Sequence, residues 1–476
     1  MLFNSLNFII FLGGVVMVYY LLPKNLMRKV FLLGASWYFY ACYDLTMLLI
    51  LLFDTIVAYG YGLCQTKTKS KTVFIATIAL LLLPLLSFKY LNFLFDTIRD
   101  VFLLANLTIT MPSFELLLPI GISFYTFMAV GYVIDVYNVK VKEERNLLDF
   151  ALFIGFFPQI SSGPIGRANQ LIPQLKEKKA LIYGNVTAGA RMMLWGFFMK
   201  LVVGDRANIY VDSVFGNYTH HNGLSLLLAT FMYTIQIYCD FAGYSLIAIG
   251  AAKLMGYNLM ENFHRPYFAT SVADFWHRWH ISLSTWFRDY VYFPCGGSRC
   301  SKVKTYRNLM ITFLVSGLWH GAAYNFILWG GYHAVNQIVG KMVQAPKDKI
   351  RGVLHIGDKS HIRKIWDVVL TFFLITYGWM LFYAPDMRFI IDVSKKYLHW
   401  GSPYIHQTTI FFFIIGFVIL FIKDFKDEYL LDKVRGFEGK HPKLNVIWHY
   451  LEFSILAILI VWIGVLGGGQ FIYFKF

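Results

Sequence analysis

Long apolar runs are the feature that most constrains how this chain can fold. Several of them approach the roughly 20 residues that an α-helix needs to cross the hydrocarbon core of a bilayer. Only 15% of the 476 residues are charged, whereas a soluble protein has about 25%. The runs are Leu6–Leu22, Leu45–Tyr61, Val73–Phe88, Leu226–Ile237, Val368–Tyr383, Thr409–Ile422 and Ile455–Leu466. We therefore predict an all-α polytopic membrane protein with about 11–13 membrane segments, some of them re-entrant.

Positive charge gathers in short loops between these runs and predicts the orientation of the chain. The net charge is +16, and Lys and Arg concentrate in the cytoplasmic loops of membrane proteins. The basic loops at 24–29, 67–71, 347–364 and 423–443 are therefore expected in the cytoplasm, with no need for a nucleic-acid partner. Both termini, including Phe471–Phe476, would then lie outside the cell membrane. The first apolar segment lacks a charged region and a cleavage site, which favours a retained helix over a signal peptide.

Three segments at membrane depth are poor in aliphatic residues and predict an internal cavity. They are Pro119–Tyr137, Phe156–Arg167 and Ala273–Ser298, and each mixes Pro or Gly with aromatic and polar residues. Irregular or polar backbone at this depth is tolerated only where protein or a water-filled cavity covers it. Because no linker or repeat divides the sequence, we expect 1–476 to form a single membrane domain, with its core at about 115–340.

His320 lies in the apolar stretch Leu309–Trp329 and is the first candidate functional residue. An ionisable group at membrane depth is costly and is a functional hypothesis whose partner must be named. The block Trp276–His280 supplies a candidate partner, His280. A neutral imidazole can remove the proton from a hydroxyl as the oxygen attacks a thioester or ester carbonyl. The alternative for His320 alone is a hydrogen-bonded structural histidine.

The block around His280 allows three interpretations. At helical spacing His277 and His280 share one face, as do Asp274 and Arg278. The two histidines could belong to a metal site, but no third ligand stands at helical spacing and no HExxH motif occurs. The segment could instead anchor an interfacial helix, or it could form an active-site wall opposite His320. The five cysteines have no metal-ligand spacing, and the GxSxG and Walker A motifs are absent, so a serine hydrolase and an ATP-driven pump are unsupported.

Two further polar residues lie close to apolar segments. Asp240 follows an apolar run and needs a partner, for which we consider Arg288, Arg278 or a histidine; a buried structural ion pair is the alternative. The segment Pro158–Arg167 is typical of a kinked or broken helix. It would either line the cavity, with Arg167 at its polar end, or serve only helix packing.

Taken together, these motifs resemble those of the membrane-bound O-acyltransferase (MBOAT) family, in its bacterial alginate O-acetyltransferase-like branch. The resemblance implies a ring of tilted membrane helices around a funnel. His320 matches the catalytic histidine of the family, and His280 matches its second signature position. The matching segments are Met1–Ser5, Pro119–Phe127, Pro158–Arg167, Asp240–Ser245, Trp276–Asp289, Gly317–Gly321 and Phe471–Phe476.

The resemblance also implies an activity, a donor and partners. An O-acetyltransferase of this kind moves an acetyl group from a cytosolic thioester, by default acetyl-CoA or else a carrier-protein thioester, toward an extracytoplasmic polysaccharide or other envelope glycan. It holds no permanent cofactor and works with an external SGNH-hydrolase-like partner protein. His320 would be the general base or acyl relay, and His280 would orient or polarise the reacting groups. The expected supporting residues are Asp240, Trp276, Arg288, Asp289 and Trp319.

Other functions remain open on the sequence. Transfer of D-alanine or another acyl group to teichoic acid would use the same machinery. A transporter without acyl chemistry predicts inverted repeats with paired broken helices, and a structural scaffold would tolerate the loss of both histidines. Ala242 and Leu246 stand where related sequences often have Ser and Asp, and these departures concern the substrate rather than the class of reaction.

Overall fold

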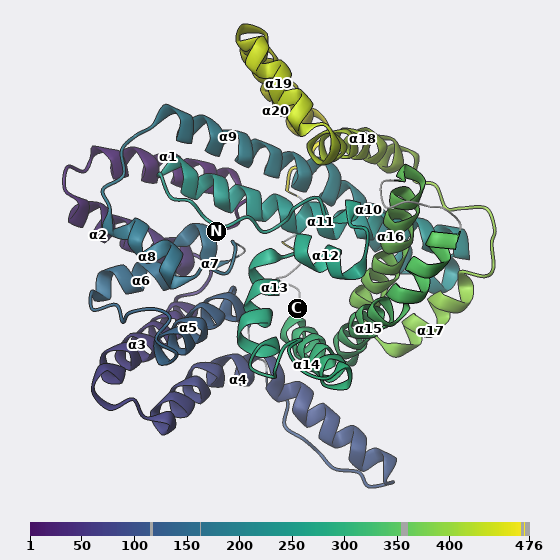
Figure 1. The fold of residues 1–476 in the computed structure, drawn as a ribbon, viewed down its shortest axis with the longest axis horizontal. Coiled ribbons are helices and arrows are strands. Elements are labelled where there is room, and N and C mark those ends of the chain that lie inside the picture. The colour runs from purple at the N-terminus through teal and green to yellow at the C-terminus, as the bar shows by residue number, and fades with distance from the viewer. Residues whose placement is uncertain (115–117, 162, 354–359, 468–470, 472–476) are drawn as a thin grey trace.

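The computed structural model describes residues 1–476 except 115–117, 162, 354–359, 468–470 and 472–476. The described residues form helices and contain no strand (Figure 1). The first part comprises α1 (Leu6–Leu21), α2 (Asn25–Ala41), α3 (Leu45–Thr68), α4 (Lys71–Leu104), α5 (Ile122–Tyr137), α6 (Leu147–Gly155), α7 (Phe157–Ile160), α8 (Ala168–Lys176), α9 (Tyr183–Phe197) and the π-helix η1 (Phe198–Gly204). The all-α class predicted from the sequence is confirmed.

The second part of the chain continues with helices of very different length. It comprises α10 (Asp205–Phe215), η2 (Tyr218–His220), α11 (Gly223–Leu254), η3 (Pro266–Phe268), α12 (Val272–Arg278), α13 (Ile281–Phe287), η4 (Arg288–Tyr292), α14 (Lys302–His320), α15 (Tyr324–Val353), α16 (His361–Tyr383), α17 (Met387–Lys396), α18 (Gln407–Tyr429), α19 (Leu431–Lys440) and α20 (Pro442–Ile463). Of the terminal motif Phe471–Phe476, only Phe471 lies within the described residues.

Several helices are long and apolar enough to cross a membrane. Within the part of the chain that the structure describes, 7 stretches meet this description by length and composition. They are Leu45–Gln65, Lys71–Leu104, Tyr183–Phe215, Gly223–Leu254, His361–Tyr383, Gln407–Tyr429 and Val446–Ile463. Two shorter apolar helices are α1 and α5. The chain is therefore a multi-pass membrane protein, as its apolar runs predict.

Helix α11 forms the centre of the molecule. It packs against α9, α10 and α16, and Figure 1 shows it with α12 and α13 between the N-terminal helices on the left and α14–α17 on the right. In its most apolar stretch 78% of the residues are buried, against 11% in α4. A helix that is apolar on all sides belongs in the interior, whereas the exposed apolar side chains of α4 suit contact with lipid.

Two of the three irregular segments meet each other, which explains their composition. Helix α6 ends before Phe156, and the short α7 follows it with Pro158 in its first turn. Gly121 precedes α5 with a φ of +76°, and a Cβ there would lie only 2.2 Å from the carbonyl oxygen of Ile160. Glycine accepts both the positive φ and this close approach. The backbones around Gly121 and Ile160 can therefore touch.

The third irregular segment breaks at the candidate histidine. Helix α12 ends at Arg278, and His280 adopts a left-handed conformation with a φ of +43° at the start of α13. The expectation that His277 and His280 share one helix face is therefore wrong, because the helix does not continue between them. The expected pair of Asp274 and Arg278 is confirmed, with 2.9 Å between Oδ1 and Nε.

Helices α14 and α15 pack so closely that their contact requires glycine. A Cβ added to Gly317 would lie 2.2 Å from the carbonyl oxygen of Phe326, and one added to Gly330 would lie 2.3 Å from that of Phe313. Real side chains cannot approach backbone this closely. Gly317 lies one turn before the end of α14, so this contact fixes the part of the helix that carries His320.

Candidate functional site

His320 is the last residue of α14, and aromatic rings surround it. Only 3% of its surface is exposed. The centroid of its ring lies 4.9 Å from that of Trp319, 4.9 Å from that of Trp329 and 5.2 Å from that of Phe382. The imidazole is therefore held inside the protein, in an apolar environment in which electrostatic interactions are strong.

Helix α4 satisfies the carbonyl groups at this end of α14. Lys89 Nζ donates to the carbonyl oxygens of Trp319 at 2.7 Å and His320 at 2.8 Å. The hydroxyl of Tyr90 donates to the carbonyl oxygen of Leu318. The last carbonyls of a helix lack partners within it, and a cation beside them also interacts favourably with the helix dipole. Sequence reasoning missed Lys89, although its signal was a single lysine directly after the apolar run Val73–Phe88.

His280 is fully buried and is held by a chain of hydrogen bonds. Its Nδ1 lies 3.0 Å from Oδ1 of Asn262, and the amide nitrogen of Asn262 donates to Oγ of Ser245 at 3.0 Å. The ring of Phe241 packs edge-on against the imidazole, with 4.6 Å between the centroids. Asn262 was not singled out from the sequence, where a loop asparagine 18 residues before the histidine carries no visible signal.

The structure brings the two candidate histidines to one tryptophan. The Trp319 ring centroid lies 6.1 Å from that of His280 and 4.9 Å from that of His320. Phe124 packs against both Trp319, at 5.6 Å, and His280, at 6.2 Å. Residues from α5, the α12–α13 break and the end of α14 therefore converge on one region.

A first pocket lies beside His320. Two of the irregular segments supply most of its wall, while the third approaches it through the contact of His280 with Trp319. Its lining residues are Lys89, Leu118, Pro119, Ile120, Gly121, Ile122, Ser123, Phe124, Ser161, Trp319 and His320.

A second pocket lies next to the residues that hold His280. Asn262 and Ser245 line it, so the hydrogen-bonded chain that holds His280 reaches this pocket. Ala242 and Leu246 line it as well. The two positions that the sequence analysis noted as departures from the family pattern therefore line the same pocket.

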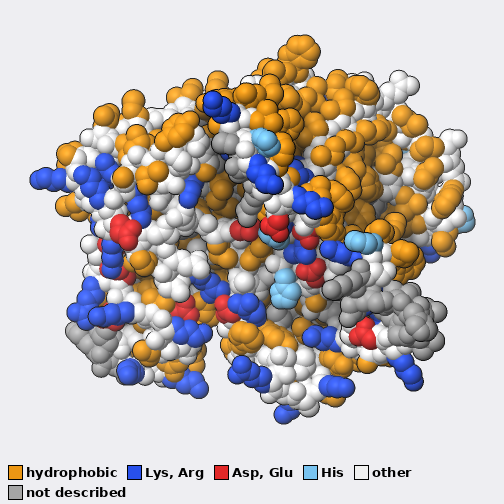
Figure 2. Space-filling model, turned by 45° about the horizontal axis from the view of Figure 1, so that its top comes forward, with side chains coloured by type: hydrophobic (Ala, Val, Ile, Leu, Met, Phe, Trp, Pro, Cys, Tyr) orange, Lys and Arg blue, Asp and Glu red, His pale blue; other side chains and the backbone are white. Residues whose placement is uncertain are grey.

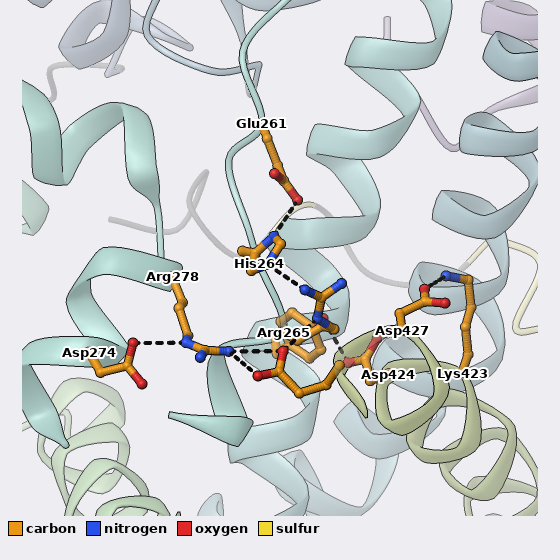
Figure 3. Close-up of polar contacts among 10 residues, drawn as sticks. Glu261, His264, Arg265, Asp274, Arg278, Lys423, Asp424 and Asp427 are labelled. Carbon is orange, nitrogen blue, oxygen red and sulfur yellow. Dashed lines mark hydrogen bonds and ion pairs between the residues drawn. The ribbon is translucent and has the colours of Figure 1, made fainter. Parts of the chain in front are cut away.

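Charged residues surround the second pocket and tie its wall to α18 (Figure 3). Glu428 accepts hydrogen bonds from Arg265 at 2.8 Å and from Arg278 at 3.1 Å. Lys423 pairs with Asp427 at 2.6 Å on the same helix. Figure 2 shows acidic, basic and histidine side chains gathered near the middle of one face. These ion pairs connect the loop that carries Asn262, and the helix before His280, to the end of α18.

The other predicted supporting residues lie at different distances from the histidines. Trp276 packs against Trp329, with 5.5 Å between centroids, and Trp329 in turn contacts His320. Asp289 forms a separate cluster with Arg167, at 3.1 Å, and Arg288, at 2.9 Å. The side chain of Arg288 is 48% exposed, so it belongs to the surface rather than to the buried region around the two rings.

Asp240 has a partner that sequence reasoning did not consider. We expected Arg288, Arg278 or a histidine, but the buried ion pair is with Lys200 of the π-helix η1. Lys200 also binds Asp205, with 2.8 Å between Nζ and Oδ1. The expectation was wrong because Lys200 lies 40 residues away in an apolar run and reaches Asp240 only through the packing of η1 on α11.

The chemistry available at the first pocket comes from imidazole and amine groups. Within the described residues, no three His, Cys, Asp or Glu side chains are placed to hold a metal ion. His320 can exchange a proton with a hydroxyl or thiol group, His280 lies on the other side of Trp319, and Lys89 brings an amine to the same pocket. This combination suits the transfer of an acyl group between a thiol and a hydroxyl.

Comparison with known proteins connects this arrangement to one family. The sequence model of the membrane-bound O-acyltransferase (MBOAT) family matches residues 32–384 of this chain. The chain is 36% identical to the probable alginate O-acetylase AlgI of Pseudomonas syringae pv. tomato over 394 residues, which cover 82% of this chain and 73% of that protein. It is 32% identical to the peptidoglycan O-acetyltransferase of Helicobacter pylori over 438 residues, which cover 83% of this chain and 79% of that protein.

A relative with a different acyl group is also similar. The teichoic acid D-alanyltransferase of Bacillus subtilis is 30% identical over 352 residues, which cover 71% of this chain and 84% of that protein. The region matched by the family model, residues 32–384, includes the α12–α13 break and the end of α14, where the two histidines lie. The chain belongs to the membrane-bound O-acyltransferase family, and it is an acyltransferase of the membrane.

Proposed function

We propose that this protein is an O-acetyltransferase that moves an acetyl group from a cytosolic thioester donor toward an extracytoplasmic glycan. One observation carries the proposal: His280 and His320 both pack against Trp319, His320 lines the first pocket, and Asn262, which binds His280, lines the second. A donor and an acceptor can therefore approach one buried site through two pockets. The acetyl group is favoured because relatives at 36% and 32% identity are named as O-acetyl-transferring enzymes.

The positive-inside rule supports one orientation of the two pockets in the membrane. The basic loop before α4 is placed in the cytoplasm by the positive-inside rule. Lys89 follows Lys71 by 18 positions on α4, which is about 27 Å along a helix, close to the roughly 30 Å thickness of the hydrocarbon core. The first pocket then belongs to the external half. The second pocket is lined by Lys423, the first residue of the basic segment at 423–443. Because this segment is expected in the cytoplasm, the second pocket belongs to the cytoplasmic half.

Within this orientation the donor enters through the second pocket. The thioester, acetyl-CoA or a carrier-protein thioester, brings its carbonyl carbon between His280 and His320. His320 acts as general base or acyl relay: a hydroxyl loses its proton to the imidazole, its oxygen bonds to the acyl carbon, the C–S bond breaks and the thiolate takes up the proton. His280 orients the reacting groups. Trp319 packs against both imidazoles, and Trp276 supports His320 through Trp329, whereas Asp240, Arg288 and Asp289 act through the packing of η1, α11 and η4.

The acceptor side is where a second protein fits the scheme. An SGNH-hydrolase-like protein outside the membrane would receive the acetyl group at the first pocket and pass it to a hydroxyl of an envelope polysaccharide. The protein would then reside in the cytoplasmic membrane with both termini outside. The D-alanyltransferase relative at 30% identity makes D-alanyl transfer the second candidate, and the nature of the donor distinguishes the two.

The proposal is tested with purified protein in lipid nanodiscs, mixed with acetyl-CoA carrying a labelled acetyl group. Thioester hydrolysis or labelled protein should appear, and His320→Ala should reduce the rate by at least about 100-fold. His277→Ala is the matched control, because His277 is an exposed histidine of the same segment. Equal rates in the wild type and in His320→Ala would overturn the assignment. Reaction with a D-alanyl carrier thioester alone would select the second candidate.

A further inference from the structure

The hydrogen bonds around Asn262 fix which of its amide atoms is the oxygen. Three groups point to Oδ1: the backbone nitrogen of Ser282 at 3.3 Å, Oγ of Ser282 at 2.9 Å and Nδ1 of His280 at 3.0 Å. A backbone N–H is always a donor, so the atom that faces it must be an acceptor. The reverse orientation of the amide would place two donors against each other. Oδ1 therefore faces His280.

The other end of the same amide agrees with this orientation. The Asn262 amide nitrogen donates to Oγ of Ser245 at 3.0 Å. Asn262 is 1% exposed, Ser245 1% and Ser282 0%, so these bonds lie within the protein. Because Oδ1 has no hydrogen to give, Nδ1 of His280 must carry the proton of the bond that joins them.

The second ring nitrogen of His280 is thereby assigned as well. In a neutral imidazole with a proton on Nδ1, Nε2 carries a lone pair and acts only as an acceptor. Among the described residues Nε2 has no hydrogen-bond partner, although it is buried. Phe124, Phe241 and Trp319 contact the imidazole ring, but the faces of these aromatic rings do not donate a hydrogen bond to Nε2. A buried polar atom without a partner is costly and calls for an explanation.

The backbone of His280 points in the same direction. Its left-handed conformation, with a φ of +43°, is uncommon for a residue other than glycine. Such conformations persist where the surrounding structure over-determines them, and they are frequent at functional sites. The bonds from Asn262 to the ring of His280 and to the backbone of Ser282 hold the residue from both sides.

We propose that Asn262 is a positioning residue that fixes His280 in the tautomer with Nδ1 protonated, so that Nε2 accepts a hydrogen bond from an O–H or N–H group in the reaction site. This inference rests on the proposed function and deepens it. A neutral His280 in this state orients a donor and does not itself donate to the oxyanion that forms on the acyl carbon. Any stabilisation of that oxyanion then comes from other groups.

The tautomer can be measured without any enzymatic activity. Nitrogen-15 NMR of histidine-labelled wild-type protein in nanodiscs should show one imidazole with a protonated Nδ1 and an unprotonated Nε2. Its signals should disappear in His280→Gln, which identifies them. A protonated Nε2 at neutral pH would overturn the proposal. Because this measurement needs no substrate, its result stands even if the protein transfers no acetyl group.

Variants of Asn262 separate positioning from simple packing. Asn262→Leu keeps the volume but removes the acceptor, so we expect a rate lower by about 100-fold and a loss of the Nδ1-protonated signal. Asn262→Asp keeps an acceptor and should retain the tautomer and much of the rate. Its carboxylate stabilises the imidazolium, which should move the acidic limb of the pH–rate profile to higher pH.

The control is Asn258→Leu, a change of the same kind at an exposed asparagine of the same loop, which should react like the wild type. If Asn262→Leu and Asn262→Asp lose the rate equally and both leave the pH profile and the NMR spectrum unchanged, Asn262 only fills space and the proposal is wrong. If Asn262→Leu does not fold, the tautomer of the wild type and the shift in Asn262→Asp decide the question.

Discussion

The ammonium group of Lys89 lies 2.8 Å from the carbonyl oxygen of His320, and this bond joins two helices that are far apart in the sequence. The same nitrogen binds the carbonyl oxygen of Trp319. Neither bond involves an imidazole nitrogen, so Lys89 acts on the backbone that carries the ring. The position of the proposed base therefore depends on α4 as much as on its own helix.

Replacing Lys89 tests this dependence. Lys89→Met leaves two buried carbonyl oxygens without their donor, which should lower the free energy of unfolding by about 1–3 kcal/mol and reduce the transfer rate. Thermal unfolding in detergent and the labelled-acetyl assay measure the two effects. Lys71→Met, an exposed lysine of the same helix, should change neither quantity. Wild-type stability and rate in Lys89→Met would show that the bonds to α14 are dispensable.

The glycine contact between α14 and α15 leads to a second prediction. Gly317→Ala places a methyl group 2.2 Å from the carbonyl oxygen of Phe326, so α14 must shift. We expect a loss of about 1–3 kcal/mol of stability and a lower rate, because His320 moves with the helix. Gly340→Ala adds a methyl group where nothing lies within 4 Å. Gly340→Ala should stabilise the protein by up to about 1 kcal/mol. If Gly317→Ala were the more stable of the two variants, the close contact between α14 and α15 would be contradicted.

The buried ion pairs of Lys200 should be far more sensitive than an exposed pair. Lys200→Met leaves the carboxylates of Asp205 and Asp240 buried without their cation, which should cost about 3–5 kcal/mol. Arg145→Met breaks the pair with Glu143, in which the arginine side chain is 73% exposed, and should cost at most about 1 kcal/mol. Chemical unfolding of both variants compares them. Similar losses would mean that Lys200 does not neutralise the two acids.

Glu428 should control the mobility of the segment that leads to His280. Glu428→Gln removes the charge shared by Arg265 and Arg278, so the Asn262 loop and α12 lose their attachment to α18. Hydrogen exchange should become faster in 258–280, and the transfer rate should fall. Asp432→Asn, an exposed acid on the next helix, is the control. Unchanged exchange in Glu428→Gln would place the attachment elsewhere.

The sequence predicts the helices of this protein better than it predicts their contacts. Apolar runs such as Leu45–Tyr61 and Thr409–Ile422 became α3 and α18 because length and apolarity are local properties. His320 stood out for the same reason, as an ionisable residue in an apolar stretch. The pairing of His277 with His280 failed because helical spacing assumes a continuous helix, and the left-handed residue interrupts it.

Partners brought together by packing were beyond sequence reasoning. Lys200 reaches Asp240, and Lys89 reaches His320, only after separate helices have associated. Asn262 lies in a loop with no periodic pattern, and its role depends on the direction of one amide group. These contacts are tertiary, and each joins a polar group to a partner that the spacing of residues along one helix does not identify.

The aromatic rings around the two histidines also bear on the membrane potential of the cell. Phe124, Phe241 and Trp319 pack against His280. A passage open to water from both sides would let protons run down the membrane potential at every moment of the catalytic cycle. Closely packed rings oppose such a leak, because water and ions are costly to place among apolar side chains. The packing that shapes the reaction site should therefore also keep the protein from conducting protons and ions across the bilayer.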